Sequence, residues 1–92
     1  MSGVVLTAHV KDPVRWEKSF RTHRDLFKES HVSLIHYTIT GGNDVVMYSE
    51  TDDVESYKRL VSSTAVVRAM EEDGVDRSSV KVYTLDKELK PS

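Results

Sequence analysis

The chain has 92 residues, of which 38% are hydrophobic and 30% are charged, and its formal net charge is -2. That length leaves no room for a second core, so we expect a single domain over residues 1–92. The small net charge gives no electrostatic reason to expect nucleic acid or an anionic membrane as a partner. Because the sequence contains no cysteine, disulfides, thiol catalysis and thiolate metal sites are excluded.

The N-terminal residues Met1-Ser2-Gly3 lead directly into an apolar-rich segment, without the basic and apolar regions of a signal peptide. No apolar run approaches the roughly 20 residues that a membrane-spanning helix needs. We therefore expect a cytoplasmic protein. A domain of this size buries only about 60–65% of its unfolded surface, so self-association is a natural way to gain core.

Residues 4–11 are rich in valine and leucine and alternate in the manner of a strand. Asp12 and Pro13 end this strand, because Asp12 can cap a helix and Pro13 fits the first helical turn. The helix is predicted to continue to about Ser30. A stripe with the spacing i, i+4, i+7, i+11 marks its buried face, formed by Trp16, Phe20, His23 and Phe27.

Residues 32–40 and 45–50 predict two further strands, joined in a hairpin by the Gly-Gly-Asn-Asp turn at residues 41–44. Asp52, followed three residues later by Glu55, resembles a capping box that begins a second helix near residue 53. Residues 62–64, Ser-Ser-Thr, break the pattern of this helix and offer a new cap, residues 65–73 form another helical piece, and Gly74 ends it. Residues 80–85 predict the last strand and residues 86–92 a polar tail that can cross to a neighbour.

The resulting order, βαββαβ, predicts the ferredoxin-like α+β fold, in which a four-stranded antiparallel sheet carries two helices on one face. The helices cover only one side of such a sheet, yet the strands keep apolar residues on both sides. A face exposed to water should show a cleaner polar alternation. We therefore expect a homodimer in which the two open faces pack together. His36 then faces the partner sheet, whereas Tyr37 faces the helices.

The chain resembles the dimeric α/β-barrel superfamily, which includes antibiotic biosynthesis monooxygenases, polyketide cyclases, muconolactone isomerases and stress-responsive barrel proteins. The resemblance covers nearly the whole chain. The first strand ends in Val10-Lys11-Asp12, and Trp16, Phe20 and His23 follow. Residues 63–70 and the pair Gly74-Val75 match a later segment, with Thr64 where proline is usual. These motifs are caps, a core aromatic and a turn glycine, so they identify the fold better than the reaction.

His23 is the strongest candidate for chemistry, because the four histidines are the side chains whose charge changes near neutral pH. A neutral imidazole on the aromatic stripe could accept a proton, with Tyr37 holding a substrate oxygen. Trp16, Phe20 and Phe27 would form the walls of an apolar pocket. The alternative is that His23 is a buried core residue held by hydrogen bonds.

His9 and His36 are predicted on the sheet face that points away from the helices, where they either line a barrel lumen or pack in the dimer interface. No HxH, HxxxH or HExxH spacing occurs, and we interpret the carboxylates of Glu71, Glu72, Asp73 and Asp76 as solvated, so no metal site is predicted. A haem role like that of some superfamily branches would require an axial histidine on the second helix, and residues 53–73 contain none. We expect no cofactor.

Two functions remain open. The first is a cofactor-independent monooxygenase, cyclase or isomerase that acts on a small aromatic or polyketide-like molecule. The second is a non-catalytic dimeric module that binds a small ligand or serves in assembly or stress response. A cavity beside His23, with a ring nitrogen facing open volume, favours the enzyme. A filled core in which hydrogen bonds lock His23 favours the module.

Overall fold

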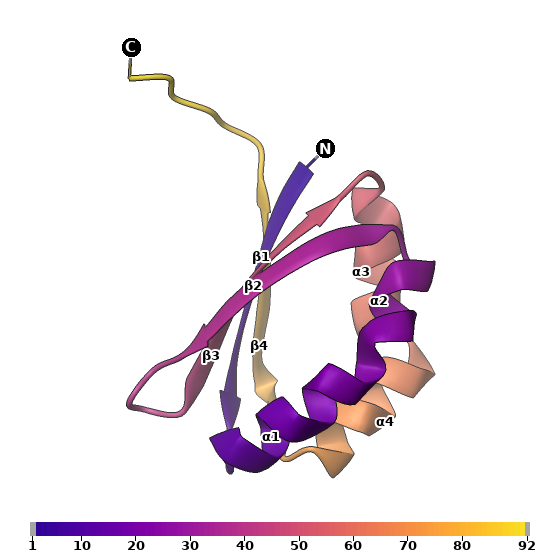
Figure 1. Cartoon of the computed structure of the whole chain (residues 1–92), viewed down its shortest axis with the longest axis vertical. Helices are drawn as coiled ribbons and strands as arrows, with labels where there is room; N and C mark the ends of the chain where they lie inside the picture. Colours follow the sequence, from indigo (N-terminus) through magenta and orange to yellow (C-terminus); the bar gives the residue numbers. More distant parts are fainter. Residues whose placement is uncertain (1, 92) are drawn as a thin grey trace.

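A computed structural model describes residues 2–91, so Met1 and Ser92, the two ends of the expected domain, lie outside the described residues. The elements are, in chain order, β1 (Ser2–Val10), α1 (Pro13–Phe20), the 3₁₀ turn η1 (Arg21–His23), α2 (Arg24–Glu29), β2 (Val32–Ile39), β3 (Asp44–Thr51), α3 (Val54–Ser62), α4 (Thr64–Glu72) and β4 (Val75–Leu85). The strands form one antiparallel sheet in the order β2-β3-β1-β4. The helices lie on one face of it (Figure 1), which confirms the ferredoxin-like fold.

Local signals position most of these elements as the sequence predicts. The Asp12 side chain accepts a hydrogen bond from the Arg15 amide, and Pro13 opens α1. Ser63 separates α3 from α4 and caps α4 by accepting from the Val66 amide. Gly74 follows α4 with a φ of 78°, a left-handed conformation that glycine adopts without steric cost. The turns therefore form where short-range chemistry requires them.

Four details differ from the sequence-based expectations. The first helix is interrupted at η1 instead of continuing to Ser30, and the cap of α3 is Asp53 rather than Asp52. The strand β4 begins at Val75, five residues earlier than expected. Simple alternation along residues 32–40 would place Val32 and Leu34 on one face, but a register irregularity between them sets Val32 opposite Thr51. The last of these differences is a bulge-like irregularity, which changes the face that neighbouring residues occupy.

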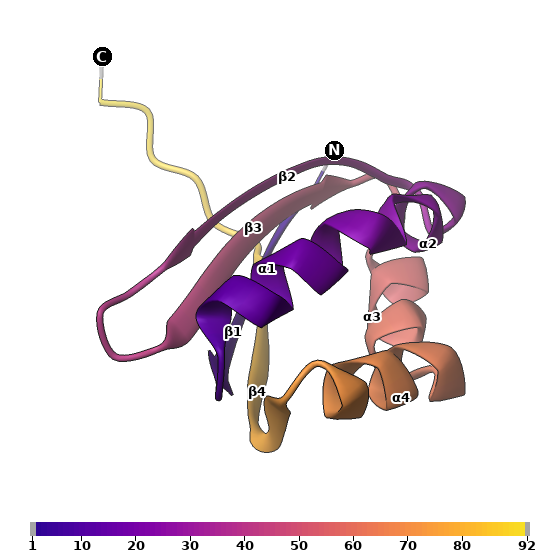
Figure 2. The ribbon, with the colours of Figure 1, turned by 60° about the horizontal axis from the view of Figure 1, so that its bottom comes forward.

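The core lies between the sheet and the helices. Alternate residues of β1 and β3 are buried there, with Val4, Val10 and Val45 at most 1% exposed. Trp16 and Leu60 reach this layer from α1 and α3. Figure 2 shows the helices as two arms on the same side of the sheet. We call residues 13–29 the first arm and residues 54–73, which include the C-cap of α4, the second arm.

One part of the core carries two polar groups. The hydroxyls of Ser49 on β3 and Tyr57 on α3 are buried, and neither has a well-formed hydrogen bond within residues 2–91. Burial raises the pKa of Tyr57 above its ordinary value, and the nearby Ser49 hydroxyl lowers it by less. An ionised Tyr57 is therefore disfavoured in the folded protein.

This raised pKa predicts a loss of stability at high pH. Below about pH 10 Tyr57 is protonated in both states and its contribution is fully present. As the pH rises further, the unfolded chain releases the proton while the folded chain keeps it, so the free energy of unfolding falls towards the folded pKa. We expect Tyr57→Phe to reduce this alkaline loss and to change stability at pH 7 by less than about 1 kcal/mol, because the lost hydroxyl is poorly paired. Urea unfolding of both proteins at pH 7 and pH 11 tests these two expectations. If Tyr57→Phe loses as much stability between pH 7 and pH 11 as the wild type does, Tyr57 is not the cause of the alkaline loss.

Candidate functional site

A cavity of about 70 Å³ lies between the two helical arms and the sheet. Its floor is formed by core residues of β1 and β3, including Leu6 and Met47, and its sides come from both arms. The wall is hydrophobic except at two positions, His23 and Asp73. On the helix side several of the lining residues are only half-buried, namely Leu26, Phe27, Val61, Val66, Ala69 and Met70.

His23 lines this cavity from the end of η1. Its backbone angles, φ -98° and ψ 24°, lie near the sparsely populated bridge region, where many active-site residues occur. A 3₁₀ stretch inside a helical segment often marks a hinge or local strain. The ring is half-buried and forms no hydrogen bond within residues 2–91. His23 is therefore a wall residue of the cavity, without a hydrogen bond to the described part of the chain.

The three aromatic residues predicted as pocket walls all line the cavity. Trp16 and Phe20 stack with their ring centroids 4.8 Å apart and their planes 12° from parallel. Phe20 meets Phe27 edge to face at 5.4 Å. Because α1, η1 and α2 keep the stripe on one side, the rings follow one another along the first arm. They provide a rigid apolar surface next to His23.

Tyr37 lies behind the aromatic stack and is not part of the cavity wall. Its ring meets Trp16 and Phe20 edge to face at 5.8 and 5.3 Å, and its hydroxyl donates to Glu17 Oε2 at 2.5 Å. Burial and this hydrogen bond to Glu17 raise the pKa of Tyr37. Tyr37 therefore faces the helices as predicted, but the structure does not bring its hydroxyl together with His23.

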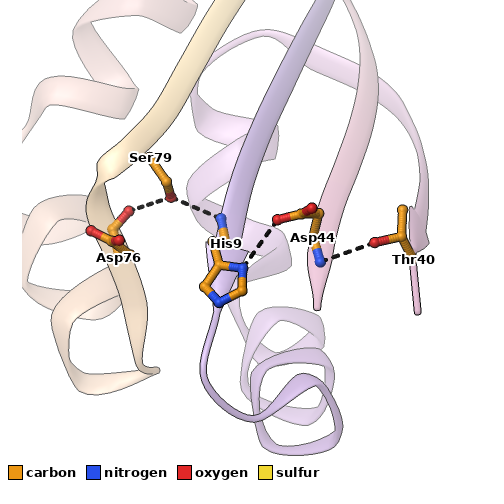
Figure 3. Close-up of polar contacts among 5 residues, drawn as sticks. All are labelled: His9, Thr40, Asp44, Asp76 and Ser79. Carbon is orange, nitrogen blue, oxygen red and sulfur yellow. Dashed lines mark hydrogen bonds and ion pairs between the residues drawn. The ribbon is translucent and has the colours of Figure 1, made fainter. Parts of the chain in front are cut away.

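His9 lies on the opposite face of the sheet, at the end of β1 near the β2–β3 hairpin. Its Nδ1 is 3.1 Å from Asp44 Oδ1, and its backbone amide donates to Ser79 Oγ at 2.8 Å (Figure 3). These residues, with Thr40, Lys81 and others, line an open hollow of about 520 Å³. His9 thus belongs to a hollow on the open face and is separated from the apolar cavity by the sheet.

His36 also lies on the open face, where it belongs to a row that crosses all four strands. The register pairs His36 with Tyr48, Tyr48 with Val5, and Val5 with Tyr83. The His36 and Tyr48 ring centroids are 6.5 Å apart. Tyr48 lies across Gly3, where an added Cβ would come within 2.7 Å of its ring. His9 and His36 therefore share a face, as predicted, but neither lines the cavity that contains His23.

Asp73 is the site residue that sequence reasoning missed, because it was interpreted as solvated. It is half-buried, lines the cavity and accepts a hydrogen bond from Ser19 Oγ at 2.6 Å. A signal was present: Val66, Met70 and Asp73 are spaced i, i+4, i+7, which places Asp73 on the inner stripe of the second arm. The run of acidic residues around it concealed that position.

An imidazole and a carboxylate thus line an otherwise hydrophobic cavity, the combination of groups from which acid–base sites are built. Among residues 2–91, no three histidine, aspartate or glutamate side chains gather as a candidate metal site. In the same part of the chain, none of the helices has the length and apolar character needed to cross a membrane.

Comparisons with known proteins give similarity in structure only. No protein-family model and no curated protein sequence matches the chain. A candidate antibiotic biosynthesis monooxygenase from Bordetella bronchiseptica superposes with a TM-score of 0.71 at 11% identity, covering 97% of this chain and 100% of that one. A candidate antibiotic biosynthesis monooxygenase from Deinococcus radiodurans superposes with a TM-score of 0.68 at 9% identity, covering 100% and 97%.

SnoaB from Streptomyces nogalater, a cofactor-independent oxygenase, superposes with a TM-score of 0.66 at 12% identity, covering 99% of this chain and 97% of that one. At such low identity a shared structure does not carry a shared reaction. The chain has the fold of the antibiotic biosynthesis monooxygenase-like proteins over nearly its whole length, as the resemblance in its sequence implied.

Proposed function

We propose that this protein binds a small aromatic or polyketide-like molecule in the cavity between the helical arms, and that His23 moves a proton to or from it. The observation that carries the proposal is the position of His23 on the wall of an apolar cavity. Its ring forms no hydrogen bond within residues 2–91. The aromatic stack of Trp16 and Phe20 offers a flat surface to a ring-shaped ligand.

The proposed chemistry needs no metal or organic cofactor. A neutral imidazole accepts the proton of a phenol or of an activated carbon acid, and the resulting anion is delocalised over the ligand. Return of the proton at another carbon completes an isomerisation, and attack of the carbanion on a carbonyl of the same molecule begins a cyclisation. Reaction of the anion with dioxygen would give an oxygenation, which is the activity named for SnoaB.

The small size of the cavity favours the second candidate function, a non-catalytic module. Sites for drug-sized ligands usually have about 300–1,000 Å³, whereas this cavity has about 70 Å³. An engineered cavity that binds benzene has about 150 Å³, so even a one-ring ligand requires the arms to separate. Leu26, Phe27 and Met70 are half-buried at the helix side of the cavity, and an unbranched methionine adapts readily to such a change.

We further propose that the protein is a homodimer in which the open sheet faces pack together. Large apolar side chains are exposed on that face, at 37% for Val46, 44% for Leu34, 49% for Tyr83 and 50% for Leu85. Exposed apolar side chains gathered on one face of a sheet are typical of an interaction surface. Residues 86–91 extend away from the sheet without strand or helix (Figure 1), in the manner expected of a tail that reaches a second copy.

The test of function uses 2-tetralone, a bicyclic carbon acid, as the probe. Wild-type protein in deuterated buffer should accelerate exchange of the carbon-bound protons, measured by NMR. We expect His23→Gln to reduce the acceleration at least 10-fold, because a positioned base typically contributes about 10²–10⁴-fold. The melting temperature should change little, since the side chain adjoins open volume.

His31→Asn is the matched control. His31 is exposed, and its Nδ1 lies 3.3 Å from Asp52 Oδ1. Its φ of 68° is one that asparagine tolerates. We expect it to leave the exchange unchanged. Binding of 2-tetralone without any exchange would support the non-catalytic module instead. If the melting temperature of His23→Ala falls by many degrees and the wild-type protein does not bind 2-tetralone, His23 is a core residue.

A further inference from the structure

We propose that Asp73 determines which ligands the cavity accepts, by selecting neutral molecules that carry a hydroxyl donor over anionic ones. This inference rests on the proposed binding function and concerns a residue on the opposite arm from His23. His23 and Asp73 are the two ionisable groups on the cavity wall. His23 belongs to the first arm and Asp73 ends the second arm, so a ligand between the arms can contact both.

Asp73 is held in place from several directions. Its backbone amide donates to Ala69 O at 2.9 Å as the C-cap of α4, and its Oδ1 accepts from Ser19 Oγ at 2.6 Å. The adjoining backbone is tied to the start of the first arm. Arg15 donates to Glu72 O at 2.9 Å, and the Lys11 amide donates to Gly74 O at 3.0 Å. The carboxylate therefore keeps a defined position.

The chemistry of this carboxylate is that of an acceptor in apolar surroundings. Ser19 Oγ donates a hydrogen bond to Asp73 Oδ1, and within residues 2–91 Asp73 Oδ2 accepts none. An ionised carboxylate only accepts hydrogen bonds, so a ligand that approaches it must donate one. A second carboxylate would be repelled, because like charges repel each other more strongly in partly apolar surroundings than in water. A phenolic hydroxyl satisfies both conditions.

A matched set of one-ring probes separates these effects. Phenol has a hydroxyl donor, anisole is the same ring without the donor, and benzoate carries a negative charge. We expect wild-type protein, followed by NMR titration at pH 7, to bind phenol at least 10-fold more tightly than anisole or benzoate. A buried polar group left without its partner makes this kind of discrimination large.

Asp73→Asn keeps the size of the side chain and an oxygen for Ser19, and it replaces one acceptor by an NH₂ donor. We expect the preference for phenol over benzoate to fall at least 10-fold in this variant. Glu72→Gln is the control, because it makes the same change of charge at the exposed neighbouring residue, which does not line the cavity. It should retain the wild-type preference.

The outcomes separate this inference from the function on which it rests. His23→Gln should retain the preference for phenol, because Asp73 is intact there. Equal binding of all three probes by wild type, or an unchanged preference in Asp73→Asn, overturns the role of Asp73 and leaves proton transfer by His23 standing. Absence of binding by every probe overturns both proposals. Thermal unfolding of each variant checks that the change in preference does not reflect a loss of structure.

Discussion

Replacing Trp16 by alanine is expected to lower the free energy of unfolding by about 3–5 kcal/mol, the range found for deletion of a large core aromatic. Trp16 is only 6% exposed, and it joins α1 to the sheet. Its indole stacks on Phe20 at 4.8 Å and meets Tyr37 edge to face at 5.8 Å, so the substitution removes both aromatic contacts together with the buried area. Urea unfolding followed by circular dichroism gives the value.

Val14→Ala is the control for this substitution, because Val14 lies on the same helix and is 80% exposed. Its effect should remain within about 0.5 kcal/mol. Phe20→Ala should also destabilise the protein, but by less than Trp16→Ala, because Phe20 is half-buried beside the cavity. A loss below about 1 kcal/mol for Trp16→Ala would show that the indole contributes to a pocket wall rather than to the core.

The second large effect is expected from Val46→Lys on the open face of the sheet. Val46 lies on β3 between Thr38 of β2 and Thr7 of β1, one row from the row of His36, Tyr48, Val5 and Tyr83. In a twofold face-to-face dimer the change places two unpaired ammonium groups in the interface, and burying an unpaired charge is costly. We expect the dissociation constant of the dimer to rise by at least about 100-fold, as measured by sedimentation equilibrium.

Val14→Lys is the matched control, because it introduces the same side chain at an exposed position on α1, the helix side of the molecule. It should leave the association unchanged. The wild-type interface should exceed about 1,000 Å² in total, as stable assemblies do. A wild-type protein that sediments as a monomer at micromolar concentration would eliminate the dimer, and the barrel with it.

Short-range features of the sequence were sufficient to predict the order of the elements and most of their ends. Strand alternation predicted His9 on the open face, in agreement with the burial of its neighbours Ala8 and Val10 on the other face. The alternation of the second strand likewise predicted the helix-side position of Tyr37. Asp12, Ser63 and Gly74 act through hydrogen bonds or backbone angles within a few residues, so their roles are visible without a fold. The stripe of Trp16, Phe20, His23 and Phe27 likewise predicted one wall of the cavity.

Only the tertiary structure decided which side chains meet across elements. A periodic pattern tells which face a residue occupies, but not which residue of a distant segment lies opposite. Ser19 and Asp73 are 54 positions apart in the chain, and His9 and Asp44 are 35 apart, so neither pair has a local signature. Tyr37 faces the helices as predicted, yet its hydroxyl reaches Glu17 instead of the cavity because the Trp16–Phe20 stack lies against its ring. The carboxylate beside His23 was therefore found through packing, since packing alone brings the end of the second arm against the first.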